Sequence, residues 1–214
     1  MTTRDTFLAT VRSRLAAGVH ESAIRPLAPV TTEPVAYAVD LTDPVGAFTR
    51  AAQAVGAEVI DGDDLATLVG GVVGRLGAQR VVVADDPECE GVAAVLTGLG
   101  VEILANGDPA VVATADLGIT GAAAGIALTG SLVVGSRRAG TRLASLLPPV
   151  HLALLPRRRI VPTPGDLLRG WSEARLEVLG SNIVLITGPS RSADIELQLT
   201  VGVHGPERML IALL

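Results

Sequence analysis

Cysteine is almost absent from this 214-residue sequence, in which Cys89 is the single example. One thiol cannot form a disulfide within the chain, and it cannot supply the thiolate set that iron–sulfur clusters and structural zinc sites require. Any redox centre is therefore expected to belong to a partner or to a diffusible cofactor. Cys89 itself is expected to be an ordinary small residue at a helix start, because nothing beside it suggests nucleophilic catalysis.

Aromatic residues and positive charge are also scarce. Aromatics make up 2% of the sequence, and the formal net charge is −5. A site for single-stranded nucleic acid needs several exposed aromatic rings, and non-specific binding to nucleic acid needs a basic surface. Both functions are therefore disfavoured, although an acidic total still leaves room for a local anion site.

Long apolar runs are missing, although 49% of the residues are hydrophobic. No run approaches the roughly 20 residues of a membrane span, and the polar start of the chain is unlike a signal peptide. We therefore expect a cytoplasmic protein without a membrane segment. The length favours one sizeable core over two full domains. We expect an N-terminal helix and linker over residues 1–34 and one α/β domain over residues 35–214.

The hydrophobic periodicity predicts an α/β fold with a mostly parallel sheet. Arg80–Ala84 is a continuous run typical of a buried parallel strand, and a helix over 92–99 and a strand over 101–104 complete a βαβ unit. Further strands are expected at 35–39, 58–60, 131–134, 151–155, 183–187 and 208–214. Further helices are expected at 4–17, from about 43, at 65–76, 122–127 and 142–147, a long one from 163, and a short helix or turn at 194–199.

Two glycine-rich segments, Gly118–Gly121 and Gly188–Ala193, are predicted to be loops that form a cleft. Each follows an expected strand, the first of them around 111–117, and ligands of open α/β sheets bind beyond the carboxyl ends of strands. Glycines would let a ligand approach the backbone closely, and the amides that follow would face an anion. A tight turn with small-residue packing explains Gly118–Gly121 equally well.

The second loop carries more chemistry. Ser190 or Ser192 is placed to cap a following helix, with Asp194 and Glu196 in or near its first turn, where the helix dipole alone would favour one acid. Arg191 is suited to a ligand carboxylate or phosphate. Asp194 is suited to accept hydrogen bonds from substrate hydroxyls or to move a proton.

Histidines near strand ends supply further candidates, although a lone histidine is more often structural. His151 and His204 are suited to act as acid or base, but their spacing does not fit a metal site, and His20 is expected to be exposed in the linker. Arg142 is singled out because it begins the helix before Ser145. The catalytic candidates are Asp194, Glu196 and His204. The ligand-binding candidates are Gly118, Thr120, Gly121, Thr129, Gly130, Ser131, Arg142, Gly188, Ser190, Arg191 and Asp194.

Six motifs together resemble the LUD (lactate-utilisation) family, in its LutC- or YkgG-like branch. The resemblance covers Leu117–Leu214 well and the first half only in general pattern. The motifs are Gly118–Thr120, Thr129–Val134, Ser145–Pro148, Ile160–Pro162, Gly188–Glu196 and Val201–Pro206.

This resemblance implies the three-layer fold shared by glucosamine-6-phosphate isomerase, ribose-5-phosphate isomerase and CoA transferases. It also implies a link to the oxidation of L-lactate to pyruvate. In such systems two partners, LutA- and LutB-like, carry the iron–sulfur clusters, so that no cofactor is expected in this chain. The single cysteine is consistent with that division of labour.

Two positions depart from the family pattern, because Ala123 and Leu128 stand where relatives commonly have Asp and Glu. Leucine cannot replace glutamate in proton transfer. Three functions therefore stay open. They are an accessory subunit with an organic-acid cleft, a stand-alone isomerase- or transferase-like enzyme acting on a phosphorylated or CoA-linked anion, and a non-catalytic binding or scaffold protein with a degenerate site.

Overall fold

The computed structural model of the chain describes residues 3–18, 39–135, 141–171, 182–193, 199–202 and 204–214. It divides into two compact units, Met1–Ala38 and Val39–Leu214. The first unit contains helix α1 (Thr3–Gly18), which confirms the helix predicted over 4–17. Most of the strand expected at 35–39 lies outside the described residues. No helix in the described part of the chain has the length and apolar character needed to cross a membrane.

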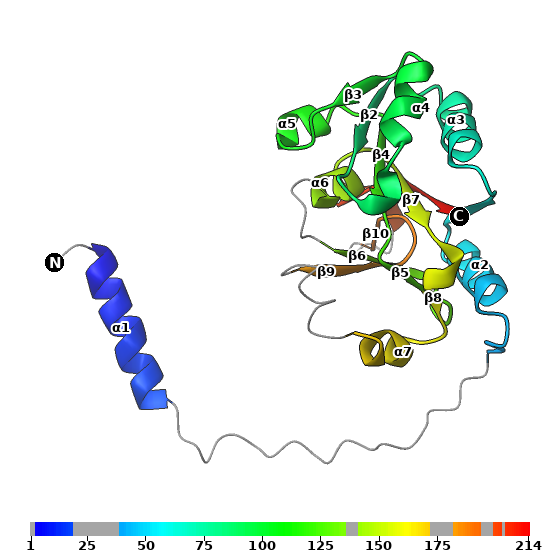
Figure 1. Cartoon of the computed structure of the whole chain (residues 1–214). Coiled ribbons are helices and arrows are strands. Elements are labelled where there is room, and N and C mark those ends of the chain that lie inside the picture. The colour runs from blue at the N-terminus through cyan, green and yellow to red at the C-terminus, as the bar shows by residue number, and fades with distance from the viewer. Residues whose placement is uncertain (1–2, 19–38, 136–140, 172–181, 194–198, 203) are drawn as a thin grey trace. The chain divides into compact units, whose positions relative to one another are not determined.

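The second unit is built on a six-stranded sheet in which every neighbouring pair is parallel (Figure 1). The spatial order is β1-β12-β7-β4-β2-β3, so the last strand of the chain lies inside the sheet. This confirms the predicted α/β class with a mostly parallel sheet. The strands are β1 (Glu58–Asp61), β2 (Arg80–Val83), β3 (Glu102–Leu104), β4 (Leu117–Gly121), β7 (Val150–Leu155) and β12 (Arg208–Leu213).

Helices cover both faces of this sheet. Side-chain caps begin two of them, because Asp43 accepts from the amide of Gly46 and Asp64 accepts from the amide of Thr67. The helices are α2 (Pro44–Ala54), α3 (Leu65–Leu76), α4 (Val92–Gly98), α5 (Pro109–Val112), α6 (Thr141–Leu146) and α7 (Pro164–Arg169), with 3-10 turns at Pro87–Cys89 and Arg157–Arg159.

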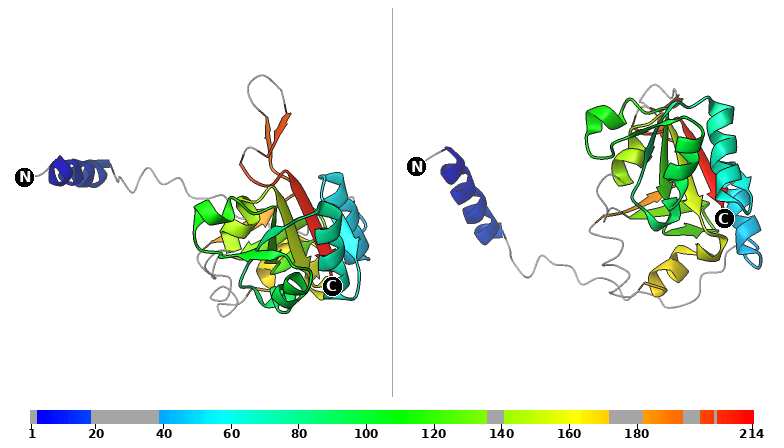
Figure 2. Two further views of the ribbon diagram at one scale, coloured as in Figure 1. Left: turned by 90° about the horizontal axis from the view of Figure 1, so that it is seen from above. Right: turned by 45° about the horizontal axis from the view of Figure 1, so that its top comes forward.

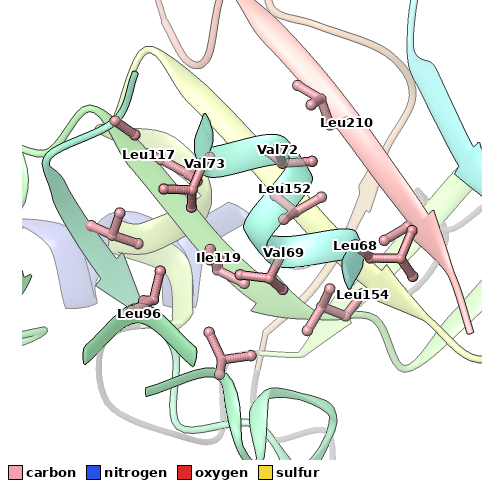
Figure 3. Packing of buried hydrophobic residues seen from close by; sticks show 14 of the residues in the cluster. Leu68, Val69, Val72, Val73, Leu96, Leu117, Ile119, Leu152, Leu154 and Leu210 are labelled. Carbon is pink, nitrogen blue, oxygen red and sulfur yellow. The ribbon is translucent and has the colours of Figure 1, made fainter. Parts of the chain in front are cut away.

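Alternation along the central strands separates two hydrophobic clusters. Leu152 and Leu154 of β7 point to one face, where they pack with residues of α3 and α4 (Figure 3). Ala153 and Leu155 point to the other face, toward α2 and a second sheet. Because successive side chains of a strand face opposite sides, His151 lies on the same side as Ala153.

The second sheet has four strands and packs against the first through a shared hydrophobic cluster. Its order is β8-β5-β6-β9, with β5 parallel to β8 and antiparallel to β6. A separate hairpin of β10 and β11 projects from the two sheets (Figure 2). The strands are β5 (Ala124–Ile126), β6 (Ser131–Gly135), β8 (Ile160–Val161), β9 (Ile183–Ile186), β10 (Arg191–Ala193) and β11 (Leu199–Val201).

The structure corrects two predictions around the first glycine-rich segment. Gly118–Gly121 is not a loop, because it belongs to β4, whose residues are all buried. Ala122–Ala127 is not helical, because Ala124–Ile126 forms β5. Alanine has a high helix propensity, but pairing with β6 and β8 outweighs that weak preference here. The segment before β4 is also different, since α5 occupies part of the expected strand.

Two further predictions fail near the end of the chain. The long helix expected from Thr163 is not continuous, because α7 ends at Arg169 with Gly170 as its C-cap. The part of it expected beyond Trp171 lies outside the described residues. Arg191–Ala193 is strand β10, so Ser190 precedes a strand and not a helix. The short helix or turn expected at 194–199, with Asp194 and Glu196, lies almost wholly outside the described residues.

Gly118→Ala should strongly destabilise the domain. A Cβ at this position would overlap the backbone carbonyl oxygen of Ala144, so α6 would have to move away from β4. We expect a loss of about 3 kcal/mol in the free energy of unfolding, measured by urea denaturation.

Gly71→Ala is the matched control for this change. A Cβ there meets no atom within 4 Å, and the residue lies on the exposed side of α3. Alanine should therefore raise the free energy of unfolding by about 0.5–1 kcal/mol. Equal effects of the two substitutions would contradict the close contact between α6 and β4.

Candidate functional site

A cavity of about 610 Å³ lies at the amino ends of β7 and β12. Its most buried lining residues include His151 and Met209, which are the second residues of these two strands and are register partners. We call it the amino-edge cavity. It lies at the opposite edge of the parallel sheet from the carboxyl ends, where the ligand site is expected from the sequence.

The lining brings together five of the predicted site residues, namely Arg142, Gly188, Ser190, Arg191 and His204. They come from α6, from the segment after β9 and from the segment before β12. Apolar side chains of β6 and β9 complete the walls. They are Val134, Val184, Leu185 and Ile186. The cavity therefore combines cationic and hydroxyl groups with an apolar surface, as small-molecule sites usually do.

Hydrogen bonds between the backbones hold the two glycine-containing segments of the wall against each other. The amide of Ser190 donates to the carbonyl of Pro206 at 2.9 Å, and the amide of Gly202 donates to the carbonyl of Ser190 at 3.1 Å. Gly188 has a φ of 74° and its Cα faces the carbonyl of Val55, where a side chain would collide. Glycine is therefore required here for both conformation and space.

Arg191 is already partly engaged by the protein. Its Nη2 donates to the carbonyl oxygen of Val55 at 3.0 Å, just after the end of α2. The guanidinium lies over Gly56, where a Cβ would overlap it. The bond fixes the side chain along the wall and leaves other N–H groups of the guanidinium for a ligand.

Arg142 and Ser145 are placed by the packing of α6 on β4. Gly118 allows the backbone of α6 to approach, so these residues, one helical turn apart, reach the cavity. Ser145 Oγ donates to the carbonyl of Arg142 at 3.1 Å, and its lone pairs can accept from a ligand. Within the described residues no ion pair is recorded for the guanidinium of Arg142.

His151 is the buried titratable group of the cavity, with 1% of its surface exposed. Its Nε2 lies 2.9 Å from Oγ1 of Thr120 in the neighbouring strand β4. Burial disfavours the charged ring and lowers the pKa of His151 to about 4. The imidazole is therefore neutral at physiological pH.

A chain of hydroxyls reaches the cavity from the second sheet. Thr129 Oγ1 lies 2.7 Å from Ser131 Oγ, which lies 2.7 Å from Thr187 Oγ1. Thr187 lines the cavity, whereas Thr129 and Ser131 stand behind it. Gly130 has a φ of 64° in the same turn and lies against the backbone of α2.

The other predicted residues that the structure describes do not line the cavity. Gly118 and Gly121 pack inside the sheet region. Gly121 donates its amide to Asp86 at 3.0 Å. Glu88, beside Asp86, pairs with Arg159. Asp194 and Glu196 lie outside the described residues.

Cys89 packs in the core, as expected of an ordinary small residue. Burial, with nearby acids, raises the pKa of its thiol to about 12, so the thiolate needed for nucleophilic chemistry does not form near neutral pH. In the part of the chain that the structure describes, no three histidine, cysteine or acidic side chains are grouped as metal ligands.

The two positions that depart from the family pattern also lie away from the cavity lining. Ala123 packs beside the cluster formed by β5, β6 and α7. Leu128 is half-buried in the turn after β5, where its amide donates to the carbonyl of Pro162 at 3.0 Å. Ala123 and Leu128 therefore contribute no group to the lining of the amino-edge cavity.

Comparison with known proteins shows the family of the chain. The family model described as "LUD domain" matches residues 109–214. Lactate utilization protein C of Halalkalibacterium halodurans is 36% identical over 154 residues, which cover 68% of this chain and 67% of that protein. The chain belongs to the LUD domain family. This confirms the resemblance carried by the six motifs.

Other similar proteins extend the comparison. Lactate utilization protein C of Bacillus subtilis is 42% identical over 95 residues, so the match spans only 39% of that relative and 43% of this chain. The crystal structure of a DUF162 family protein from Deinococcus radiodurans has a TM-score of 0.61 and 23% identity, and covers 82% of this chain and 98% of that one. This likeness supports the fold alone.

Sequence reasoning missed Thr187 and the wall supplied by Val55. Thr187 directly follows β9 and directly precedes the predicted Gly188 loop, so its position was a usable signal. The sequence held no signal for the carbonyl of Val55, because its contact with Arg191 joins residues 136 positions apart.

Acidification should destabilise the protein through His151. Its pKa is about 4 in the fold against 6.5 for the free side chain, so the unfolded chain binds the proton first. The free energy of unfolding should therefore fall as the pH drops from about 6.5 to 4, by on the order of 3 kcal/mol from this group.

Urea denaturation at stepped pH values, with wild type and His151→Gln compared, measures this contribution. The variant should lose part of the pH dependence in that window. His204→Gln is the control for the change from histidine to glutamine, because His204 is exposed. The same pH dependence in wild type and His151→Gln would contradict burial of a neutral ring.

Proposed function

We propose that this protein acts in lactate utilisation by binding a small organic anion in the amino-edge cavity. The observation that carries the proposal is the grouping of Arg142, Arg191 and Ser145 around one cavity of an LUD domain. Guanidinium groups bind carboxylates through paired, charge-assisted hydrogen bonds. The name of the curated relatives supports lactate or a related acid as the anion.

We further propose that the protein is an accessory subunit beside iron–sulfur partners resembling LutA and LutB. Oxidation of lactate to pyruvate releases two electrons, which an acceptor must take up. A chain with one buried cysteine cannot build the thiolate set of a cluster by itself. The division of labour therefore assigns electron transfer to the partners and anion binding to this chain.

Arg142→Gln should weaken binding of L-lactate and pyruvate by about tenfold or more. The substitution removes a charge-assisted contact to the carboxylate and leaves a neutral amide on a shorter side chain. Isothermal titration calorimetry on the full chain measures the change.

Arg158→Gln provides the matched control for the charge change, since Arg158 is exposed and does not line the cavity. It should bind both acids as wild type does. Equal weakening by both substitutions would show that net charge alone attracts the anion, and unchanged binding in Arg142→Gln would remove Arg142 from the site.

Co-expression with the iron–sulfur subunits of a lactate-oxidising system tests the accessory role. A stable complex in gel filtration, with lactate oxidation that requires this chain, is the expected outcome. Turnover of a phosphorylated or CoA-linked anion by the isolated chain would favour the stand-alone enzyme instead. Binding of the partners without any anion would favour a scaffold.

A further inference from the structure

We propose that His151 recognises an oxygen atom next to the carboxylate of the ligand, so that the amino-edge cavity selects 2-hydroxy and 2-oxo acids over unsubstituted acids. The inference rests on the proposed function and deepens it, because it names the substrate class and the residue that distinguishes it. Arg142 holds the carboxylate, and His151 is the specificity-determining residue.

His151 lines the cavity, and one of its two ring nitrogens is engaged within the protein. Its recorded hydrogen bond uses Nε2, which contacts Thr120. In the described part of the chain, Asn106 Oδ1 is the single fully buried side-chain polar atom without a hydrogen-bond partner. Nδ1 of His151 is therefore not a fully buried atom without a partner. Because the ring lines the cavity, the cavity is the space that this nitrogen can reach. A polar atom without a protein partner, on a buried ring that lines a cavity, is suited to bind a ligand.

The position of this nitrogen relative to Arg142 follows from the sheet register. Gly118 of β4 is the register partner of His151 of β7, and α6 rests directly on Gly118. The wall that carries Arg142 and Ser145 therefore adjoins the wall that carries His151. In a 2-hydroxy or 2-oxo acid, the carbon that carries the extra oxygen is bonded directly to the carboxylate carbon. Two adjoining polar walls can therefore contact the carboxylate and the extra oxygen at the same time.

Because the ring is neutral, it is suited to form a hydrogen bond with an uncharged oxygen. Burial keeps the ring uncharged, so it does not compete with Arg142 for the carboxylate. When the hydroxyl of Thr120 donates to Nε2, Nδ1–H donates to an oxo or hydroxyl oxygen. When Nε2–H donates to Thr120, Nδ1 accepts from a hydroxyl. A hydroxy acid can therefore form a hydrogen bond with either tautomer, whereas an oxo acid can do so only with the tautomer that carries hydrogen on Nδ1.

Comparison of L-lactate with propanoate tests the inference, because propanoate has the same carboxylate and lacks the 2-oxygen. Wild type should bind lactate at least about tenfold more tightly, since a buried polar group left without its partner is costly. His151→Phe keeps a ring of similar size and removes both nitrogens. It should bring the ratio of the two dissociation constants to about one while propanoate binding stays within about threefold of wild type.

Variants of Thr120 show whether this residue orients the ring of His151 or only supports the fold. Thr120→Val removes the hydroxyl with little change in shape and should lower the ratio, whereas Thr120→Ser should restore it. The ratio is the informative quantity, because a purely structural role would weaken both acids equally. Arg158→Gln should leave the ratio unchanged.

A measurement on the wild-type protein keeps the test independent of folding of the variants. Nitrogen NMR of labelled histidine should show a shift of the His151 Nδ1 signal with lactate and none with propanoate. Equal binding of the two acids by wild type would overturn the inference and leave anion binding in place. Absence of binding by either acid would overturn the inference and the proposed function together.

Discussion

Direct contact between backbones at glycine positions is the constraint on which the cavity depends. Gly118 lets α6 rest on β4, Gly130 lets the turn before β6 rest on α2, and Gly188 lets the segment after β9 pass the carbonyl of Val55. Each contact excludes a Cβ, and two of the three residues also need a positive φ. Together they bring α6, the second sheet and the end of α2 close enough to enclose one cavity at the amino edge of the parallel sheet.

The elements with strong local signals were predictable from the sequence. The strand expected at Arg80–Ala84 and the helix expected at 65–76 match the structure, because a continuous β-branched run and an apolar helical stripe are signals carried by a few neighbouring residues. Gly118–Gly121 was mistaken for a loop, since its glycines serve the packing of α6 and not a turn. Ala124–Ile126 was mistaken for helix, because its strand character comes from partners distant in sequence.

The site was predictable in composition and less so in geometry. Arg142, Ser190, Arg191 and His204 were expected near a ligand, and they line one cavity. Its location at the amino edge was not expected, because the general rule for α/β sheets describes a single sheet covered by helices. Here the second sheet and α6 close the opposite edge. The burial of His151 also depends on α6 and the second sheet, which cover its face of β7 and come from parts of the chain distant in sequence.

The row of hydroxyls from Thr129 through Ser131 to Thr187 has a consequence of its own. Each of its two contacts can have either oxygen as the donor, so the three protons can be aligned in one direction or in the other. In one alignment Thr187 offers its hydrogen to the cavity, and in the reverse alignment it offers a lone pair. One wall can thus change from donor to acceptor by rotation of three hydroxyl hydrogens while every heavy atom keeps its place.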